Sequence, residues 1–370
     1  MNQPKHGGNL AWAATLAGCP PSSILDFSAS ISPLGPPPSV NAAIQSHLGE
    51  LRNYPDPSYY SLRSQLGQAC SLPPEWILPG NGAAELLTWA GWELSTLPTT
   101  FLLTPAFGDY RRCLQTFGAT VVDCPLLGEE EGEFLGVGEA IAQTPSGLDC
   151  LIPKLQQQKA PGGLLLNNPH NPTGQLFSKT AIEPYLEQFA LVVVDEAFMD
   201  FLPPGDQESL ITVVQDYPNL VILRSLTKFY SMPGLRLGYA IAHPDRLQRW
   251  QQWRDPWPVN ILAAAAGEAV VQDTAFQEQT WAWLPPARSQ LFEGLSRIPG
   301  LRPLPSAANF LLVRSHHSCS QLQQDLLIRH RILIRDCLSF PELGDAYFRV
   351  AVRLPEENQR LIAALTDILS

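Results

Sequence analysis

The stretch SLTKFYSMPGLRLGY, residues 225–239, places a lysine among residue types that would keep its amine reactive. Lys228 follows the hydroxyls of Ser225 and Thr227, and Arg236 comes eight residues later, after a Pro-Gly pair. A lysine kept in the interior is desolvated, and desolvation lowers the pKa of its amine and makes it nucleophilic. The stretch therefore predicts a lysine that bonds covalently to a carbonyl compound.

Three further segments carry polar groups at the ends of apolar runs that we expect to be strands. LVVVDEAFMDF has Asp195 at its strand end, LLLNNPHNPTG has Asn168 and Asn171, and LPGNGAAELL has Gly82 before a helix. In open sheets, ligands bind at the carboxyl ends of the strands, and the amides at a helix N-terminus bind phosphate. Each segment alone also has a purely structural interpretation, because aspartate caps helices and NPTG forms turns in many proteins.

Together these groups are the ones that pyridoxal 5'-phosphate requires. A lysine forms a Schiff base with its aldehyde, a carboxylate keeps its pyridine nitrogen protonated, and hydroxyls, an arginine and a helix N-terminus bind its phosphate. We therefore predict this cofactor, with Lys228 and Asp195 as the catalytic residues.

The segments NNPHNPTG, VVVDEAFMDF and SLTKFYSMPGLRLGY, in this order, resemble the fold-type I pyridoxal-phosphate enzymes of the aspartate aminotransferase superfamily. The resemblance covers nearly the whole chain. It implies that Lys228 holds the cofactor covalently, that Asp195 pairs with the ring nitrogen and that Asn171 hydrogen-bonds the ring hydroxyl. Many members carry tyrosine three residues after the aspartate, whereas this chain has Phe198, so the ring hydroxyl would lose one donor.

The same resemblance implies a phosphate site, a residue over the ring face and a homodimer with shared active sites. The phosphate site would consist of Gly82, Ala83, Ser225 and Arg236. Phe107 would cover the ring, with Tyr110 as the alternative. Tyr54, in RNYPDP, would reach the phosphate of the cofactor bound to the other protomer.

Three more segments, KHGGN, LDFSASISPLGPP and ILIRDCLSFPELGDAYFRVAVR, resemble the threonine-phosphate decarboxylases of cobalamin biosynthesis. The resemblance implies decarboxylation of L-threonine O-3-phosphate to (R)-1-amino-2-propanol O-2-phosphate. Arginine suits a substrate with a carboxylate and a phosphate, because its planar guanidinium binds both groups bidentately. The implied substrate-binding residues are His6, Ser32, Asn171, Arg335 and Arg349, whereas Arg353 is expected at the surface.

Two features leave the reaction open. The family usually has asparagines where Ser30 and Ser32 stand, and the shorter side chains affect substrate choice. The orientation of the substrate separates decarboxylation from transamination, and motifs do not encode that angle. The alternatives are a histidinol-phosphate aminotransferase or a related class I/II aminotransferase, and a domain of this fold that binds a ligand without turnover.

The elements that position these residues follow from the alternation of short apolar runs and amphipathic stretches. Apolar runs separated by helices indicate a mostly parallel sheet covered on both faces. The fold class is therefore α/β, and the resemblance implies the fold-type I transferase fold with seven strands in a large domain. We expect this domain over residues 46–255, and a small α/β domain over residues 256–370 together with the N-terminal residues 1–45.

Composition excludes several classes of partner. The chain has 370 residues and a formal net charge of −11, which disfavours nucleic acid and anionic membrane surfaces. Its seven scattered cysteines form neither a zinc motif nor a disulfide framework, so we expect no metal and a reducing compartment. The longest apolar stretch is too short to cross a bilayer, and the expected location is the cytoplasm.

Overall fold

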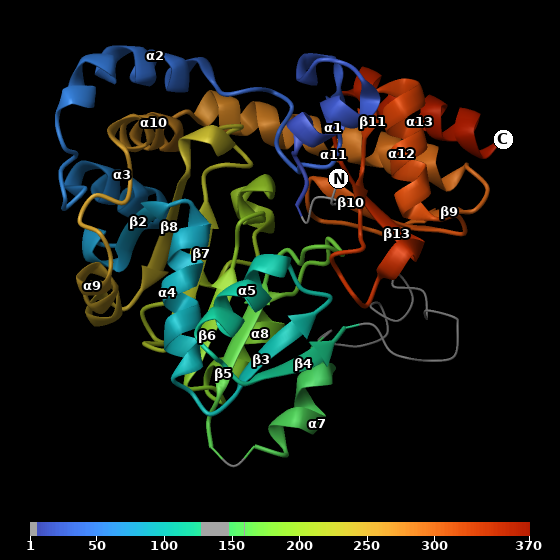
Figure 1. The fold of residues 1–370 in the computed structure, drawn as a ribbon. Helices are drawn as coiled ribbons and strands as arrows, with labels where there is room; N and C mark the ends of the chain where they lie inside the picture. The colour runs from blue at the N-terminus through green and yellow to red at the C-terminus, as the bar shows by residue number, and fades with distance from the viewer. Residues whose placement is uncertain (1–5, 127–147, 159) are drawn as a thin grey trace.

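The structure is a computed structural model that describes residues 6–126, 148–158 and 160–370. At its centre lies a sheet with the strand order β2-β8-β7-β6-β5-β3-β4 (Figure 1). Within this sheet β8 runs antiparallel to both of its neighbours, and the other described pairs are parallel. The mostly parallel seven-stranded sheet predicted from the sequence is confirmed. Its strands are β2 (Ile77–Asn81), β3 (Thr100–Thr104), β4 (Val121–Pro125), β5 (Gly163–Asn167), β6 (Leu191–Asp195), β7 (Leu220–Ser225) and β8 (Leu237–Ala242).

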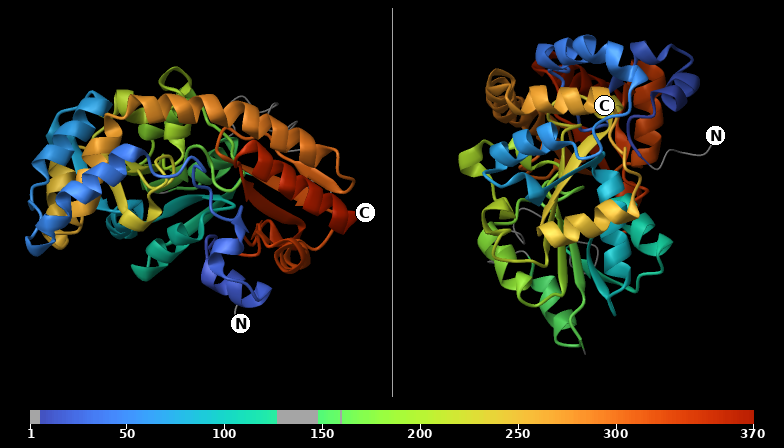
Figure 2. Two further views of the ribbon diagram at one scale, coloured as in Figure 1. Left: turned by 90° about the horizontal axis from the view of Figure 1, so that it is seen from above. Right: turned by 90° about the vertical axis from the view of Figure 1, so that its left-hand side faces the viewer.

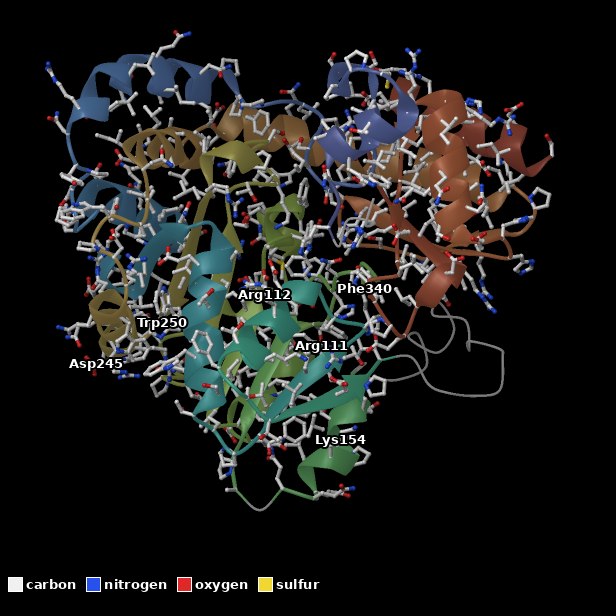
Figure 3. All side chains as sticks on the ribbon, viewed as in Figure 1. Arg111, Arg112, Lys154, Asp245, Trp250 and Phe340 are labelled. Atoms are coloured by element: carbon white, nitrogen blue, oxygen red, sulfur yellow. The ribbon has the colours of Figure 1, made fainter. Side chains whose placement is uncertain are left out.

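The central strands form because their residues are apolar on both sides. Successive side chains of β6 point to opposite faces, and Val192 and Val194 enter one hydrophobic core while Val193 enters a second. Helices α4 (Ala83–Ser95), α5 (Gly108–Thr116) and α9 (Pro244–Trp253) supply the second core, which includes the fully buried Trp250 labelled in Figure 3. Helix α8 (Lys179–Leu186) contributes to the first core.

A second, antiparallel sheet has the order β12-β13-β10-β9. Its strands are β9 (Leu301–Pro303), β10 (Phe310–Ser315), β12 (Arg335–Asp336) and β13 (Tyr347–Ala351). Three helices gather beside this sheet, as Figure 2 shows: α11 (Thr274–Ser296), α12 (Cys319–His330) and α13 (Pro355–Leu369). Helix α13 begins at Pro355, where proline's missing N–H costs no intrahelical hydrogen bond.

The N-terminal segment packs on the part of the molecule that contains the second sheet. Strand β1 (Leu25–Asp26) pairs in parallel with β11 (Ile332–Leu333), and α1 (Leu10–Ala17) packs on α12. Farther along the chain, α2 (Pro38–His47) and α3 (Tyr60–Cys70) pack on α10 (Ile261–Val271), which also touches β8. The domain boundaries expected near residues 45 and 255 stay a prediction. The packing of α2 and α10 against each other and of α10 against β8 favours placing both helices with the large domain.

Over the described residues, no helix is both long enough and apolar enough to cross a membrane.

Candidate active site

A cavity of about 400 Å³ opens where the large sheet meets the small one. Asn167, Asp195 and Ser225 line it, and they end the neighbouring parallel strands β5, β6 and β7. The sequence-predicted site residues that line this cavity are His6, Ala83, Phe107, Asn171, Asp195, Ser225, Lys228, Arg236, Arg335 and Arg349. Residues separated by more than 300 positions in the chain therefore meet in one place, at the edge of the sheet where such folds bind ligands.

Lys228 lies in the turn that follows β7. Its backbone carbonyl accepts a hydrogen bond from Ser32 N at 3.0 Å, which ties this turn to the N-terminal segment. The side-chain amine lies 4.8 Å from the centre of the Phe198 ring. Burial lowers the pKa of the Lys228 amine, although the nearby Asp195 carboxylate acts in the opposite direction. A lowered pKa increases the fraction of free amine, the form that attacks a carbonyl.

Asp195 is held by two hydrogen bonds at the end of β6. Its Oδ1 accepts from Ala197 N at 2.9 Å, and its Oδ2 accepts from the Tyr110 hydroxyl at 2.9 Å. Burial raises the pKa of this carboxyl, and the charge of Lys228 and the two hydrogen bonds lower it. The carboxylate faces the cavity, so it is available to a cationic nitrogen of a bound molecule.

The turn before α4 forms a cradle for an anion. Gly82 has φ +75°, and a Cβ there would lie 2.5 Å from Arg236 Nη2. Only glycine therefore lets the guanidinium approach this turn so closely. Ser225 and Thr227, whose hydroxyls lie 2.7 Å apart, line the same cavity. The N-terminus of the thirteen-residue helix α4, the guanidinium of Arg236 and the hydroxyls of Ser225 and Thr227 are groups that fit the phosphate of pyridoxal phosphate.

Glu85 fixes the shape of this turn from behind. Its Oε2 accepts a hydrogen bond from Asn81 N at 2.7 Å, and its Oε1 accepts from Trp89 Nε1 at 3.0 Å. The buried Arg254 forms an ion pair with Glu85 at 3.4 Å and also donates to Pro79 O at 2.6 Å. Glu85 of α4 is therefore tied to Asn81 at the end of β2, and Arg254 adds a hydrogen bond to Pro79 of the same strand, so the approach to Gly82 is held in place.

Arg335 and Arg349 supply positive charge on the opposite wall. They are direct partners on the antiparallel strands β12 and β13, and both line the cavity. Arg349 donates to Asn171 Oδ1, and Arg335 donates to Ser339 Oγ. Burial lowers the pKa of Arg335, and burial together with Arg335 lowers that of Arg349 to about 10. Two neighbouring buried guanidiniums are matched by a ligand with two anionic groups.

The first residues of the described chain lie at the rim of the cavity. His6 is half exposed, with its ring centre 5.7 Å from that of Phe107 and its Nε2 3.9 Å from Asp109 Oδ1. Phe340 lines the cavity from the small sheet's side, and Arg111 of α5 joins the two parts by pairing with Asp123 at 2.7 Å and Glu342 at 3.9 Å. Figure 3 labels both Phe340 and Arg111 near this junction.

Three predicted residues do not line the cavity: Gly82, Ser32 and Tyr54. Gly82 lies against the guanidinium of Arg236, which does line the cavity. Ser32 is buried, and its hydroxyl accepts a hydrogen bond from Leu34 N at 3.4 Å. Tyr54 is 77% exposed and stacks on Trp257 with ring centres 4.4 Å apart. The chain's own cavity thus contains neither Ser32 nor Tyr54.

Some lining residues were missed by the sequence reasoning. Ser30 lines the cavity and is buried, and among the described residues its hydroxyl has no hydrogen-bond partner. Ser28, Asp109 and Ser339 also line it. A signal existed for Ser30, since it replaces a family asparagine, but Ser32 carries the same signal two positions later, so the sequence could not choose between them.

Comparisons with known proteins agree with this geometry. The family model of aminotransferase class I and II matches residues 22–365. The chain is 38% identical to the threonine-phosphate decarboxylase of Salmonella typhimurium over 99% of this chain and 96% of that protein. It is 36% identical to the histidinol-phosphate aminotransferase of Symbiobacterium thermophilum over 91% and 88%. The structure of histidinol-phosphate aminotransferase from Sinorhizobium meliloti in complex with pyridoxal-5'-phosphate shares the fold, with a TM-score of 0.81, 22% identity and coverage of 98% and 94%.

Proposed function

The chain belongs to the aminotransferase class I and II family, and from this premise we propose that it decarboxylates L-threonine O-3-phosphate. It is an enzyme that depends on pyridoxal 5'-phosphate. The products are (R)-1-amino-2-propanol O-2-phosphate and CO2, and the reaction belongs to cobalamin biosynthesis. The observation that carries the substrate is the cross-strand pair of Arg335 and Arg349 in the cavity wall.

The two arginines divide the substrate's anions between them. Arg349 bonds Asn171 and influences the pKa of Lys228, so it lies on the cofactor side and binds the carboxylate. Arg335 shares a small hollow with His6, on the rim side, and binds the phosphate. Bidentate hydrogen bonds from both ends fix the substrate's orientation, which selects the bond at Cα that breaks.

The cofactor site is supplied by the residues around Lys228. Gly82, Ala83, Ser225 and Arg236 would bind the cofactor phosphate, Asn171 would bond the ring hydroxyl, and Phe107 would cover one ring face. Asp195 would accept a hydrogen bond from the protonated ring nitrogen. When bound, pyridoxal phosphate supplies an electron-withdrawing ring that stabilises the electron pair left at Cα after CO2 departs.

Lys228 has two tasks. Its amine holds the cofactor covalently before the substrate arrives, and it then gives a proton to Cα, so that the carboxylate is replaced by hydrogen. Burial is the main cause that lowers the pKa of this amine, Asp195 raises it, and Arg349 and Arg236 lower it further. Positive neighbours therefore help Lys228 to release the proton in the final step.

We also propose that the enzyme is a homodimer of the cytoplasm. Leu48, Leu51, Tyr54, Tyr60 and Trp257 are large apolar or aromatic side chains left exposed, Tyr54 and Trp257 stack on each other, and a second copy would cover them. Tyr54 is exposed and does not line the cavity of its own chain, so we assign it to the cofactor phosphate of the partner. The cytoplasmic location is supported by the seven cysteines, all within the described residues and all free.

The experiment that tests the function is a turnover assay of the purified protein with pyridoxal phosphate. L-threonine O-3-phosphate is added without any keto acid, and the products are measured by mass spectrometry. We expect aminopropanol phosphate and CO2 in amounts well above that of enzyme. No product with this substrate, together with glutamate formed from histidinol phosphate and 2-oxoglutarate, would instead identify an aminotransferase.

A further inference from the structure

We infer that Tyr110 is a positioning residue that keeps the Asp195 carboxylate ionised and oriented toward the ring nitrogen of the cofactor. The inference deepens the proposed function and rests on its cofactor site. Tyr110 belongs to α5 and Asp195 ends β6, so the two side chains come from different elements and meet at the cavity wall. Their oxygens lie 2.9 Å apart, and both side chains are buried.

The direction of this hydrogen bond is fixed. Burial and the neighbouring Asp195 charge raise the pKa of the Tyr110 hydroxyl well above its usual value, so the phenol keeps its proton and donates it. A carboxylate offers about four acceptor positions on its two oxygens. Tyr110 occupies one position on Oδ2, and Ala197 N occupies one on Oδ1. Both oxygens retain a free position for a further donor inside the cavity.

The surroundings of Asp195 disfavour the ionised form of its carboxyl group. Burial is the largest influence on the pKa of Asp195 and raises it, which favours the neutral acid. A neutral acid facing a pyridine would leave the ring without its positive charge, and the ring would then withdraw electrons weakly. Hydrogen bonds to the charged form favour ionisation. Tyr110 supplies one of the two such bonds, and it is a side chain that can be changed without altering the backbone.

The role of the Tyr110 hydroxyl can be tested separately from the packing role of its ring. The Tyr110 ring packs in the core formed with α4 and α9, and it meets Phe107 edge-on with ring centres 5.5 Å apart. Phenylalanine at position 110 would keep both contacts and lose only the bond to Asp195. A packing role would therefore survive the substitution Tyr110→Phe, whereas a positioning role would not.

The test uses holoenzyme reconstituted with pyridoxal phosphate labelled with ¹⁵N in the ring, and NMR reads whether that nitrogen carries a proton. In the wild type we expect a protonated nitrogen. In Tyr110→Phe we expect the signal to move toward the unprotonated position, and kcat to fall about tenfold or more with little change in KM, since a hydrogen bond to a charged group is lost. Replacing Tyr110 by 3-fluorotyrosine, a stronger donor, should hold the ring proton more firmly.

The matched control is Tyr185→Phe, which removes a buried hydroxyl that donates to Leu148 O at 3.2 Å, outside the cavity lining. It should leave the nitrogen signal and kcat unchanged. An unchanged nitrogen signal in both Tyr110→Phe and the 3-fluorotyrosine protein would overturn the inference. The nitrogen signal is recorded without substrate, so a response at Tyr110 in a protein that fails to decarboxylate threonine phosphate would support the inference and reject only the substrate.

Discussion

Arg335 and Arg349 face each other across adjacent antiparallel strands, and both guanidiniums line one cavity. Like charges directly opposite each other destabilise a pair of strands. The cost is visible in Arg349, whose pKa falls to about 10 through burial and the charge of Arg335. The chain therefore carries a repulsion that a ligand with a carboxylate and a phosphate would relieve.

Arg349→Met should separate binding from stability. We expect KM for the phosphorylated substrate to rise about tenfold to a hundredfold, because hydrogen bonds to a charged group are lost. The free energy of unfolding without substrate should rise by about 1 kcal/mol, since a buried charge and its repulsion disappear. Arg353→Met is the control, because Arg353 pairs with Glu357 outside the cavity lining and should leave KM unchanged. An unchanged KM in Arg349→Met would remove this arginine from the substrate site.

Glu85→Gln should loosen the phosphate cradle without touching the cofactor. Glu85 accepts from Asn81 N and pairs with Arg254, so its charge holds the turn that carries Gly82. We expect the dissociation constant for pyridoxal phosphate to rise about tenfold, and excess cofactor to restore activity. Fluorescence titration of the cofactor-free protein measures this constant.

Helix α4 itself offers the matched control for that substitution. Glu93 pairs with Arg246 and Arg249, away from the cavity lining. Glu93→Gln should lower stability and leave cofactor affinity as it was. Equal losses of affinity in the two variants would mean that Glu85 acts only through the general stability of the helix.

Mixing two variants tests whether the active site is shared. Lys228→Ala removes the covalent attachment point, and Tyr54→Ala removes the residue proposed to enter the partner's site. A hybrid dimer contains one site with both changes and one site with neither. We therefore expect activity to appear when the two weakly active proteins are unfolded, mixed and refolded together. Activity no greater than the average of the two separate preparations would place Tyr54 outside the partner's site.

His170 makes the stability depend on pH. It is buried, and burial lowers its pKa from 6.5 to about 3. Between these values the unfolded chain binds a proton that the folded chain does not, so stability falls as the pH falls through 6.5. The expected slope from this residue is about 1.4 kcal/mol per pH unit. Urea unfolding of wild type and His170→Gln at pH 5 and pH 7 should show a smaller loss for the variant, with the exposed His317→Gln as control.

The ends of the central strands β5, β6 and β7 were predictable because each is an apolar run that ends in a polar residue. LVVVD and LVILRS place Asp195 and Ser225 at one edge as soon as the strands are taken as parallel. The small sheet contained no comparable signal from which the placement of its arginines could be predicted. The partnership of Arg335 with Arg349 depends on the register of two strands joined by a ten-residue connection, 337–346, and spacing alone does not fix that register.

The contact between Tyr110 and Asp195 lay equally beyond the sequence. The two residues are 85 positions apart, and a tyrosine three residues after Phe107 is adequately explained by the buried face of a helix. For Tyr54 the sequence made a prediction that the structure of a single chain does not test. Its role was expected from a resemblance, and a single chain displays only its exposure and its stacking on Trp257.

The pairing of β1 with β11 has a consequence for how the enzyme is made. Residues 25–26 pair with residues 332–333, and Ala351 N bonds Phe27 O at 2.8 Å. While the ribosome is still adding the last third of the chain, the groups for the cofactor, from Gly82 to Arg236, have already been synthesised. The cavity wall that we propose to bind the substrate cannot close until Arg335 and Arg349 have emerged. A nascent or truncated chain that ends before β11 would thus carry the residues proposed for the cofactor without the two arginines proposed to select the substrate, and the growing enzyme acquires that part of its selectivity last.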